Sequence, residues 1–226
     1  MSFICRARPT ESALGYISKG VEYQSVPVSL IKGGGEQHFP EFRALNPQGA
    51  VPIYSDHDIS LSQSLAILEY LEERYPEPTF LPGDALVRAG QFAHIIASDI
   101  HPLTNLRVLA YLRNAFKADT NQRSQWFRHW LLERLDALEL WLAAERRMFK
   151  YSVSDEISLA DICIVPQLYQ AHRFKLQLDD FPRLCAIEAA CLQLEVFSST
   201  APEPRSRYFT DMVAMVQPTA KIGIGA

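Results

Sequence analysis

Apolar and polar positions follow two different patterns along the 226-residue chain. Up to about residue 62, short apolar runs alternate with polar residues, which is the period of half-buried strands. The predicted strands are Ser2–Ile4, Val21–Leu30, Val51–Tyr54 and Ile59–Leu61. Between them, helices are predicted over Glu11–Ser18, ended by Gly20, and over Phe39–Leu45, while Lys32–Gln37 reads as a flexible loop.

The segment Asn46–Tyr75, NPQGAVPIYSDHDISLSQSLAILEYLEERY, is predicted to form a turn, two strands and a helix. Asn-Pro followed by glycine favours a turn at Asn46–Gly49, and a second turn is predicted at Asp56–Asp58. The helix is expected to open at Ser62 or Gln63. Its buried face has the three-to-four spacing of Leu61, Leu65, Leu68 and Leu71.

The start of this helix is a candidate binding site. A helix N-terminus offers unpaired N–H groups and a partial positive charge, so it can hold a carboxylate. Gln63 and Ser64 add an amide and a hydroxyl, and Val51 offers free backbone groups to an extended ligand. The alternative is purely structural, with Ser62 as an N-cap and Pro52 as a strand-edge proline.

The pattern changes after Pro76–Gly83, whose proline and glycine content is typical of a linker. Residues 1–75 are predicted to form an α/β domain, 76–84 the linker, and 85–226 an all-helical domain. The predicted helices there are Ala85–Phe116 with a bend at Pro102, Asn121–Met148, Ser158–His172 and one after Phe181–Pro182. The composition after Ser198 is typical of a disordered tail.

Two of these helices carry more specific signals. Ser158–Asp161 has the spacing of a capping box, with aspartate in place of the usual glutamate, which indicates a structural role for Asp161. In the helix Asn121–Met148, Trp126 and Trp130 are predicted to belong to the core. They share its buried face with Leu131, Leu135, Leu138 and Leu142.

A polar stripe interrupts the apolar pattern of the segment IASDIHPLTNLRVLAYL. His94, Ser98, His101 and Asn105 are spaced four, three and four residues apart, which puts them on one helix face. This face could be the solvated side of the helix. Alternatively, it faces a cleft under the first domain.

Composition excludes several functions. Hydrophobic residues make up 48% of the chain, enough for a sizeable core, and the net charge of −4 gives no support to nucleic-acid binding. No apolar run is long enough to span a membrane, and the N-terminus does not resemble a secretory signal. The four cysteines form no CxxC pair and no zinc-like spacing with histidine, so no metal is expected and a reducing cytoplasm is the expected location.

The segments NPQGAVP, SQSLAILEYLEERYP and KGVEYQSVPVSLIKGGGEQ resemble the zeta class of the glutathione transferase superfamily. The resemblance implies a thioredoxin-like α/β domain followed by an all-α domain, usually in a homodimer. It also implies a cis bond at Pro52, a Val51 backbone that pairs with the cysteinyl part of glutathione, and Gln63 and Ser64 at its γ-glutamyl end.

Two later segments extend the resemblance. DIHPLTNLRVL is similar to the family pattern DIHPxNNxRVL, which implies that Asn105 contacts glutathione and Arg107 meets a substrate carboxylate, with His101 as a further substrate-binding candidate. LADICIVPQLYQAHRFKLQL is similar to LADxxLVPQxxNAxRFxxDL, which implies that Arg173 binds a dicarboxylate through its bidentate guanidinium. The alternative for Arg173 is a cation favoured by the helix C-terminus.

The chain departs from the family near its N-terminus. Counted without a gap, the family motif SSCxWRVRIAL falls on Arg6–Tyr16, and its serines, its cysteine and its RVR are all absent. Thr10 and Ser12 are the nearest hydroxyls, and Arg8, like Arg6, could favour a thiolate by its charge. Arg8, Thr10 and Ser12 are therefore the catalytic candidates, although the arginines could equally be solvated loop charges.

The resemblance implies an enzyme, a glutathione-dependent cis-trans isomerase or transferase of small unsaturated keto acids, similar to the maleylacetoacetate isomerases. Glutathione would serve as a regenerated cofactor whose thiolate adds reversibly to the double bond. Two alternatives remain because of the altered motif. One is an enzyme diverged toward a biosynthetic substrate, and the other is a non-catalytic protein that binds glutathione or a protein partner.

Overall fold

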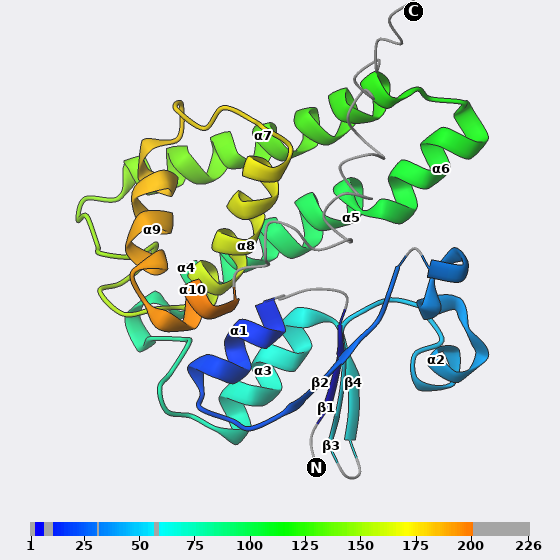
Figure 1. Ribbon diagram of the computed structural model, residues 1–226. Helices are drawn as coiled ribbons and strands as arrows, with labels where there is room; N and C mark the ends of the chain where they lie inside the picture. The colour runs from blue at the N-terminus through cyan, green and yellow to red at the C-terminus, as the bar shows by residue number, and fades with distance from the viewer. Residues whose placement is uncertain (1–2, 7–10, 31, 57–58, 201–226) are drawn as a thin grey trace, which may run out of the picture.

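The computed structural model describes residues 3–6, 11–30, 32–56 and 59–200. In the first domain a mixed sheet is interleaved with helices in the predicted order (Figure 1). Its elements are β1 (Phe3–Arg6), α1 (Glu11–Ser18), β2 (Gln24–Pro27), η1 (Lys32–Gly34), η2 (Glu36–His38), α2 (Pro40–Leu45), β3 (Ile53–Asp56), β4 (Ile59–Ser62) and α3 (Ser64–Arg74). The predicted turn at Asp56–Asp58 lies partly outside the described residues.

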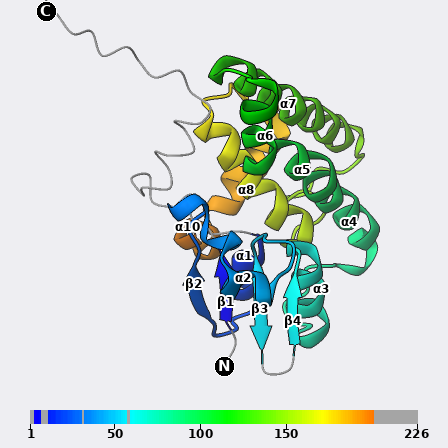
Figure 2. The same ribbon diagram turned by 90° about the vertical axis from the view of Figure 1, so that its right-hand side faces the viewer.

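The strands lie in the order β2-β1-β3-β4, and Figure 2 shows them side by side. β1 runs parallel to β2, whereas β3 is antiparallel to both β1 and β4. Parallel neighbours need a crossover, and α1 supplies it between β1 and β2. This is the thioredoxin-like arrangement that the element order predicts.

α1 and α3 pack against each other beside the sheet. Gly15 permits their close approach, because a Cβ at this position would lie 2.2 Å from Leu68 Cδ2. Tyr16 and Tyr54 contact each other in the core with ring centroids 5.3 Å apart. The buried leucine face of α3 includes Leu68 and Leu71, as its spacing predicts.

Three details of this domain differ from the sequence prediction. β2 covers four residues and is shorter than the predicted Val21–Leu30. β3 begins at Ile53, directly after Pro52, because a proline has no N–H to donate to a strand ladder. The segment predicted as a flexible loop contains the 3₁₀ turns η1 and η2.

The second domain is helical throughout, apart from its connections. Its elements are η3 (Gly83–Ala85), α4 (Leu86–His94), the π-helical η4 (Ile95–Ile100), α5 (His101–Thr104), α6 (Leu106–Phe116), α7 (Thr120–Ala144), α8 (Leu159–Arg173), α9 (Pro182–Leu192) and α10 (Glu195–Thr200). α4 packs along α8, and α10 returns to α1 of the first domain (Figure 1). In the part of the chain that is described, no helix is both long and apolar enough to cross a membrane.

The long predicted helix from Ala85 to Phe116 is interrupted at a different residue from the one predicted. The chain stays helical through Pro102 and leaves helical geometry at Asn105, which has ψ of 146°. The turn before Pro102 is π-helical, and such wider turns accommodate local irregularity. Asn105 then caps α6, because its side chain accepts a hydrogen bond from the backbone N–H of Arg107.

The capping box at the start of α8 is confirmed. The carboxylate of Asp161 accepts hydrogen bonds from the backbone N–H of Ser158 at 2.8 Å and from that of Ser152 at 2.9 Å. Asp161 is fully buried, and this burial raises the pKa of its carboxyl despite the opposing hydrogen bonds. The residue therefore joins α8 to the preceding loop.

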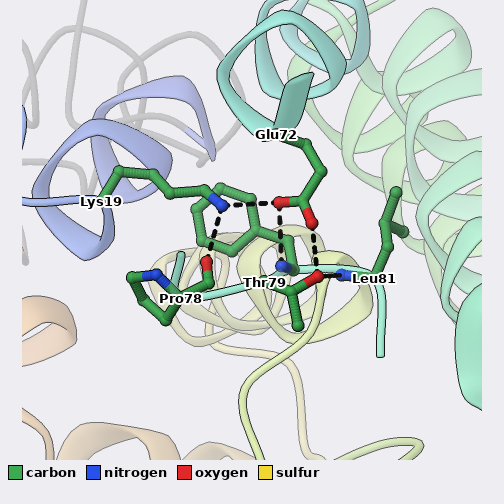
Figure 3. Close-up of polar contacts among 6 residues, drawn as sticks. Lys19, Glu72, Pro78, Thr79 and Leu81 are labelled. Carbon is green, nitrogen blue, oxygen red and sulfur yellow. Dashed lines mark hydrogen bonds and ion pairs between the residues drawn. The ribbon is translucent and has the colours of Figure 1, made fainter. Parts of the chain in front are cut away.

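A buried ion pair holds the linker against the first domain (Figure 3). Lys19 Nζ lies 2.6 Å from a carboxylate oxygen of Glu72 and donates to the carbonyl of Pro78 at 2.6 Å. The Glu72 carboxylate also accepts from the backbone N–H of Phe80 at 2.9 Å and from the hydroxyl of Thr79. These contacts join α1, α3 and the linker.

Candidate functional site

A cleft of about 270 Å³ lies between the two domains. The first domain lines it with Val51, Pro52, Gln63 and Ser64 among others. The second domain lines it with the predicted polar stripe, namely His94, Ser98, His101 and Asn105. The stripe therefore faces a cleft, as one of its two interpretations predicts.

The turn before β3 shapes one wall of this cleft. Asn46 is buried, and its side chain donates to the carbonyl of Ala50 at 2.8 Å and accepts from the backbone N–H of Gln48 at 3.0 Å. The Val51–Pro52 bond that follows is cis. Val51 precedes the first paired residue of β3, so its backbone lies at the end of a strand and beside the cleft.

The N-terminus of α3 forms the adjacent wall. Gln63 is its N-cap residue with φ of 77° and ψ of 121°, and its side chain does not cap the helix. Such backbone angles are rare outside glycine and cost about 1–3 kcal/mol, and strained residues of this kind cluster at functional sites. The Gln63 amide donates instead to Gln48 Oε1 at 3.0 Å. The first N–H groups of α3 thus remain available to a ligand.

A buried glutamate connects the start of α3 to the second domain. Glu11, in the first turn of α1, is 6% exposed. Its carboxylate accepts a hydrogen bond from Ser64 Oγ at 3.2 Å and lies 3.4 Å from His101 Nε2. Glu11 therefore joins a side chain of α3 to one of α5, and both of these residues line the cleft.

Of the predicted glutathione-binding and substrate-binding residues, the structure brings six to this cleft. The six are Val51, Pro52, Gln63, Ser64, His101 and Asn105. Arg107 is exposed on α6, and Arg173 is buried at the end of α8, where its Nη1 donates to Gln170 at 3.3 Å. Neither arginine lines the cleft. Arg8 and Thr10 lie outside the described residues, as does the side chain of Ser12.

Two residues of the site escape prediction from the sequence. Gln48 lines the cleft within the predicted turn, but nothing in a turn pattern indicates that its side chain meets Gln63. Glu11 reads as an ordinary acidic residue in a first helical turn. Its one distinguishing signal is the family motif, which has an arginine at this position.

A second cavity, of about 450 Å³, contains none of the predicted residues. Its lining includes Arg88 and Glu145, whose side chains form an ion pair at 3.1 Å across the start of α4 and the end of α7. Arg88 also lies over the ring of Trp141, 4.9 Å from its centroid. These contacts account for the two charged groups that line this cavity.

Comparison with known proteins places this fold in a class. Residues 13–79 match the family described as Glutathione S-transferase, N-terminal domain, and residues 128–195 match its C-terminal domain. A "Probable maleylacetoacetate isomerase" of Vibrio cholerae is 40% identical over 187 residues, which cover 82% of this chain and 86% of the relative.

Two solved structures are similar across both domains. The holo structure of a maleylpyruvate isomerase, described as a bacterial glutathione S-transferase of the zeta class, has a TM-score of 0.85 at 37% identity and covers 90% of this chain and 99% of its own. A maleylacetoacetate isomerase from Methylobacterium extorquens, solved with malonate and glutathione, has a TM-score of 0.84 at 30% identity and covers 90% and 97%.

The fold and the two matched domains define a glutathione S-transferase. Within that superfamily, sequence identity of 40% over most of both chains identifies the family. The chain belongs to the zeta-class family of maleylacetoacetate and maleylpyruvate isomerases.

Proposed function

We propose that this protein is an enzyme that binds glutathione in the interdomain cleft and uses it to isomerise a small unsaturated keto acid from cis to trans. The observation that carries the proposal is the composition of that cleft. It combines the end of a strand, a helix N-terminus without a side-chain cap, and a row of polar side chains from the opposite domain. This set suits a peptide-like ligand with charged ends.

The groups present fit glutathione. The backbone of Val51 would pair with its cysteinyl part, as an added strand does, while Gln63, Ser64 and the N-terminus of α3 would hold its γ-glutamyl end. Asn105 faces this wall from the second domain and would contribute a side-chain amide. Bound glutathione would supply a nucleophilic thiolate whose reversible addition lets a cis double bond rotate.

The remaining roles are proposed from the family resemblance. Arg8, Thr10 and Ser12 are proposed to favour the thiolate form of the cofactor by charge or hydrogen bonding. His101, Arg107 and Arg173 are proposed to orient the keto acid through its carboxylates. An arginine fork matches a carboxylate in two parallel hydrogen bonds, which provides orientation as well as affinity.

Calorimetric titration with glutathione tests binding, and turnover of maleylpyruvate and maleylacetoacetate tests the chemistry. Asn105→Ser serves as the site variant, because serine preserves the N-cap of α6 while removing the amide. We expect Asn105→Ser to weaken glutathione binding about tenfold, the value of one hydrogen bond to a charged group, with unchanged thermal stability. Asn121→Ser, on an exposed turn of α7, is the control and should bind as the unmodified protein does.

A second candidate is a diverged enzyme, or a non-catalytic binder, and the charge at Glu11 favours it. The family motif has an arginine where this chain has a buried carboxylate. Ultraviolet difference spectra of bound glutathione against pH distinguish the candidates. A bound thiol pKa well below its usual value of about 8.5 supports catalysis, whereas binding without ionisation supports a binder.

The resemblance also leads us to propose a homodimer in the cytoplasm. In support, Cys163, Cys185 and Cys191 are free thiols, as expected of a reducing compartment. Light scattering after gel filtration measures the assembly directly. A mass near twice 25.6 kDa is the expected result, and a single-chain mass would contradict the dimer.

A further inference from the structure

The Glu11 carboxylate contacts two residues that line the cleft, and its charge is opposite to that of the family motif. Counted without a gap, the first arginine of SSCxWRVRIAL falls on Glu11. The residue is 6% exposed, so its carboxylate is largely removed from water. A buried carboxylate acts strongly on its neighbours, because electrostatic interactions gain strength as the local dielectric falls.

The contacts of Glu11 determine how Ser64 can meet a ligand. A carboxylate only accepts hydrogen bonds, so the single hydroxyl hydrogen of Ser64 points to Glu11 Oε2 across 3.2 Å. The oxygen of Ser64 then has only lone pairs left for the cleft that it lines. Ser64 is therefore an acceptor toward a ligand, although the resemblance alone leads us to expect it to grip a carboxylate.

His101 is affected in the same way. Its Nε2 lies 3.4 Å from Glu11 Oε1 and must carry a hydrogen to interact favourably with a carboxylate. In the neutral ring with that tautomer, Nδ1 is an acceptor. Glu11 thus attracts the hydrogens of two residues that line the cleft, one from each domain.

The start of α3 therefore has two parts that differ in the charge they favour. The N–H groups at the start of α3 attract an anion, but the Glu11 charge beside Ser64 opposes an anion on that side. A ligand with a carboxylate and an ammonium on the same carbon satisfies both. The carboxylate can meet the helix N–H groups while the ammonium faces Ser64.

We propose that Glu11 is a positioning residue which, through Ser64, makes this end of the cleft a receptor for the α-ammonium group of the γ-glutamyl moiety. This inference rests on the proposed binding of glutathione. It adds a specificity determinant on α1. It also explains how the Glu11 carboxylate can lie beside the start of α3, where the helix N–H groups favour an anion.

Two truncated ligands test the inference by calorimetry. Glutaryl-cysteinyl-glycine lacks only the ammonium of glutathione, and 4-aminobutyryl-cysteinyl-glycine lacks only the carboxylate. In the unmodified protein, loss of the ammonium should weaken binding by about 10- to 100-fold, the range for a hydrogen bond to a charged group. In Glu11→Gln, the same loss should cost less than about threefold, because the charge is gone and the amide can turn the Ser64 hydroxyl toward the ligand.

Ser64→Ala is the second variant and should reduce the ammonium dependence as Glu11→Gln does. Glu69→Gln, an exposed change on the same helix, is the control and should leave that dependence intact. A purely structural role of Glu11 would weaken all three ligands by one common factor, which would overturn the inference. Tight glutathione binding with equal ammonium dependence in every variant would overturn the role of Glu11 and leave the proposed function intact. If the unmodified protein did not bind glutathione, both the role of Glu11 and the proposed function would be overturned.

Discussion

The ion pair between Lys19 and Glu72 leads to a prediction about stability. Glu72→Ala removes the carboxylate that faces Lys19 Nζ at 2.6 Å and accepts from Phe80 N at 2.9 Å. The Lys19 side chain is 0% exposed, so its ammonium would stay buried against the Pro78 carbonyl and the Phe80 ring, without a carboxylate to neutralise it. Removing one member of a buried pair costs roughly 3–5 kcal/mol, which lowers Tm by roughly 6–20 °C in a chain of this size.

Lys19→Met is expected to cost less, about 1–3 kcal/mol. It removes the cation and leaves Glu72 with its hydrogen bonds from Thr79 and Phe80. The double variant should therefore be no less stable than Glu72→Ala, because the buried charge is absent from it. Urea unfolding followed by circular dichroism measures all three free energies.

The same pair predicts a pH dependence. Burial raises the pKa of the Glu72 carboxyl, but hydrogen bonds from Lys19, Thr79 and Phe80 outweigh this and hold the pKa below its usual value. A depressed pKa in the folded state stabilises the protein above the unfolded pKa of about 4.3, and this contribution is lost as pH falls through the folded value. The difference between the unmodified protein and Glu72→Ala should thus shrink below about pH 4.

Glu73→Ala is the matched control, since Glu73 is the exposed neighbour on the same helix. Exposed substitutions of this kind usually change stability by less than about 0.5 kcal/mol. A Glu72→Ala variant as stable as Glu73→Ala would refute the reasoning. So would a loss that stays constant down to the lowest pH at which the protein folds.

Three further predictions concern single residues. Gln63→Gly should stabilise the protein by about 1 kcal/mol in urea unfolding, because glycine tolerates φ of 77°. The same change should weaken glutathione binding, and a loss of stability would contradict the backbone strain at Gln63. Asp161→Ala should cost about 3–5 kcal/mol, since buried N–H groups of α8 and the preceding loop lose their acceptor, and calorimetric unfolding checks this. Arg173→Ala should reduce turnover more than glutathione binding, with exposed Arg128→Ala as control; equal loss of both would exclude a substrate role.

Local patterns account for most of what could be predicted about the fold. The order of elements in the first domain, the helical second domain and the leucine face of α7 all follow from periods of two and 3.6 residues. The capping box at Ser158 and Asp161 was predictable because its partners are three residues apart. The shortened β2 was not, since the ends of a strand depend on where its neighbour stops pairing.

The site was predictable in part for the same reason. His94, Ser98, His101 and Asn105 share a face by helical spacing alone, so their common placement needed no tertiary information. The break at Asn105 was missed because proline is the usual sign of a bend, and here the wider π turn of η4 precedes Pro102.

The sequence by itself determined the element order, the two-domain division and the candidate groups at the start of α3, because these depend on neighbours within about one helical turn. Only the tertiary structure decided that Glu11 contacts Ser64, which lies 53 residues later in the chain, and His101, which lies later still. It also decided that the polar stripe on the helix before Asn105 faces the cleft. Burial and hydrogen-bond direction arise where distant segments pack together. A pattern read along one chain contains the residues for such contacts but not their distances.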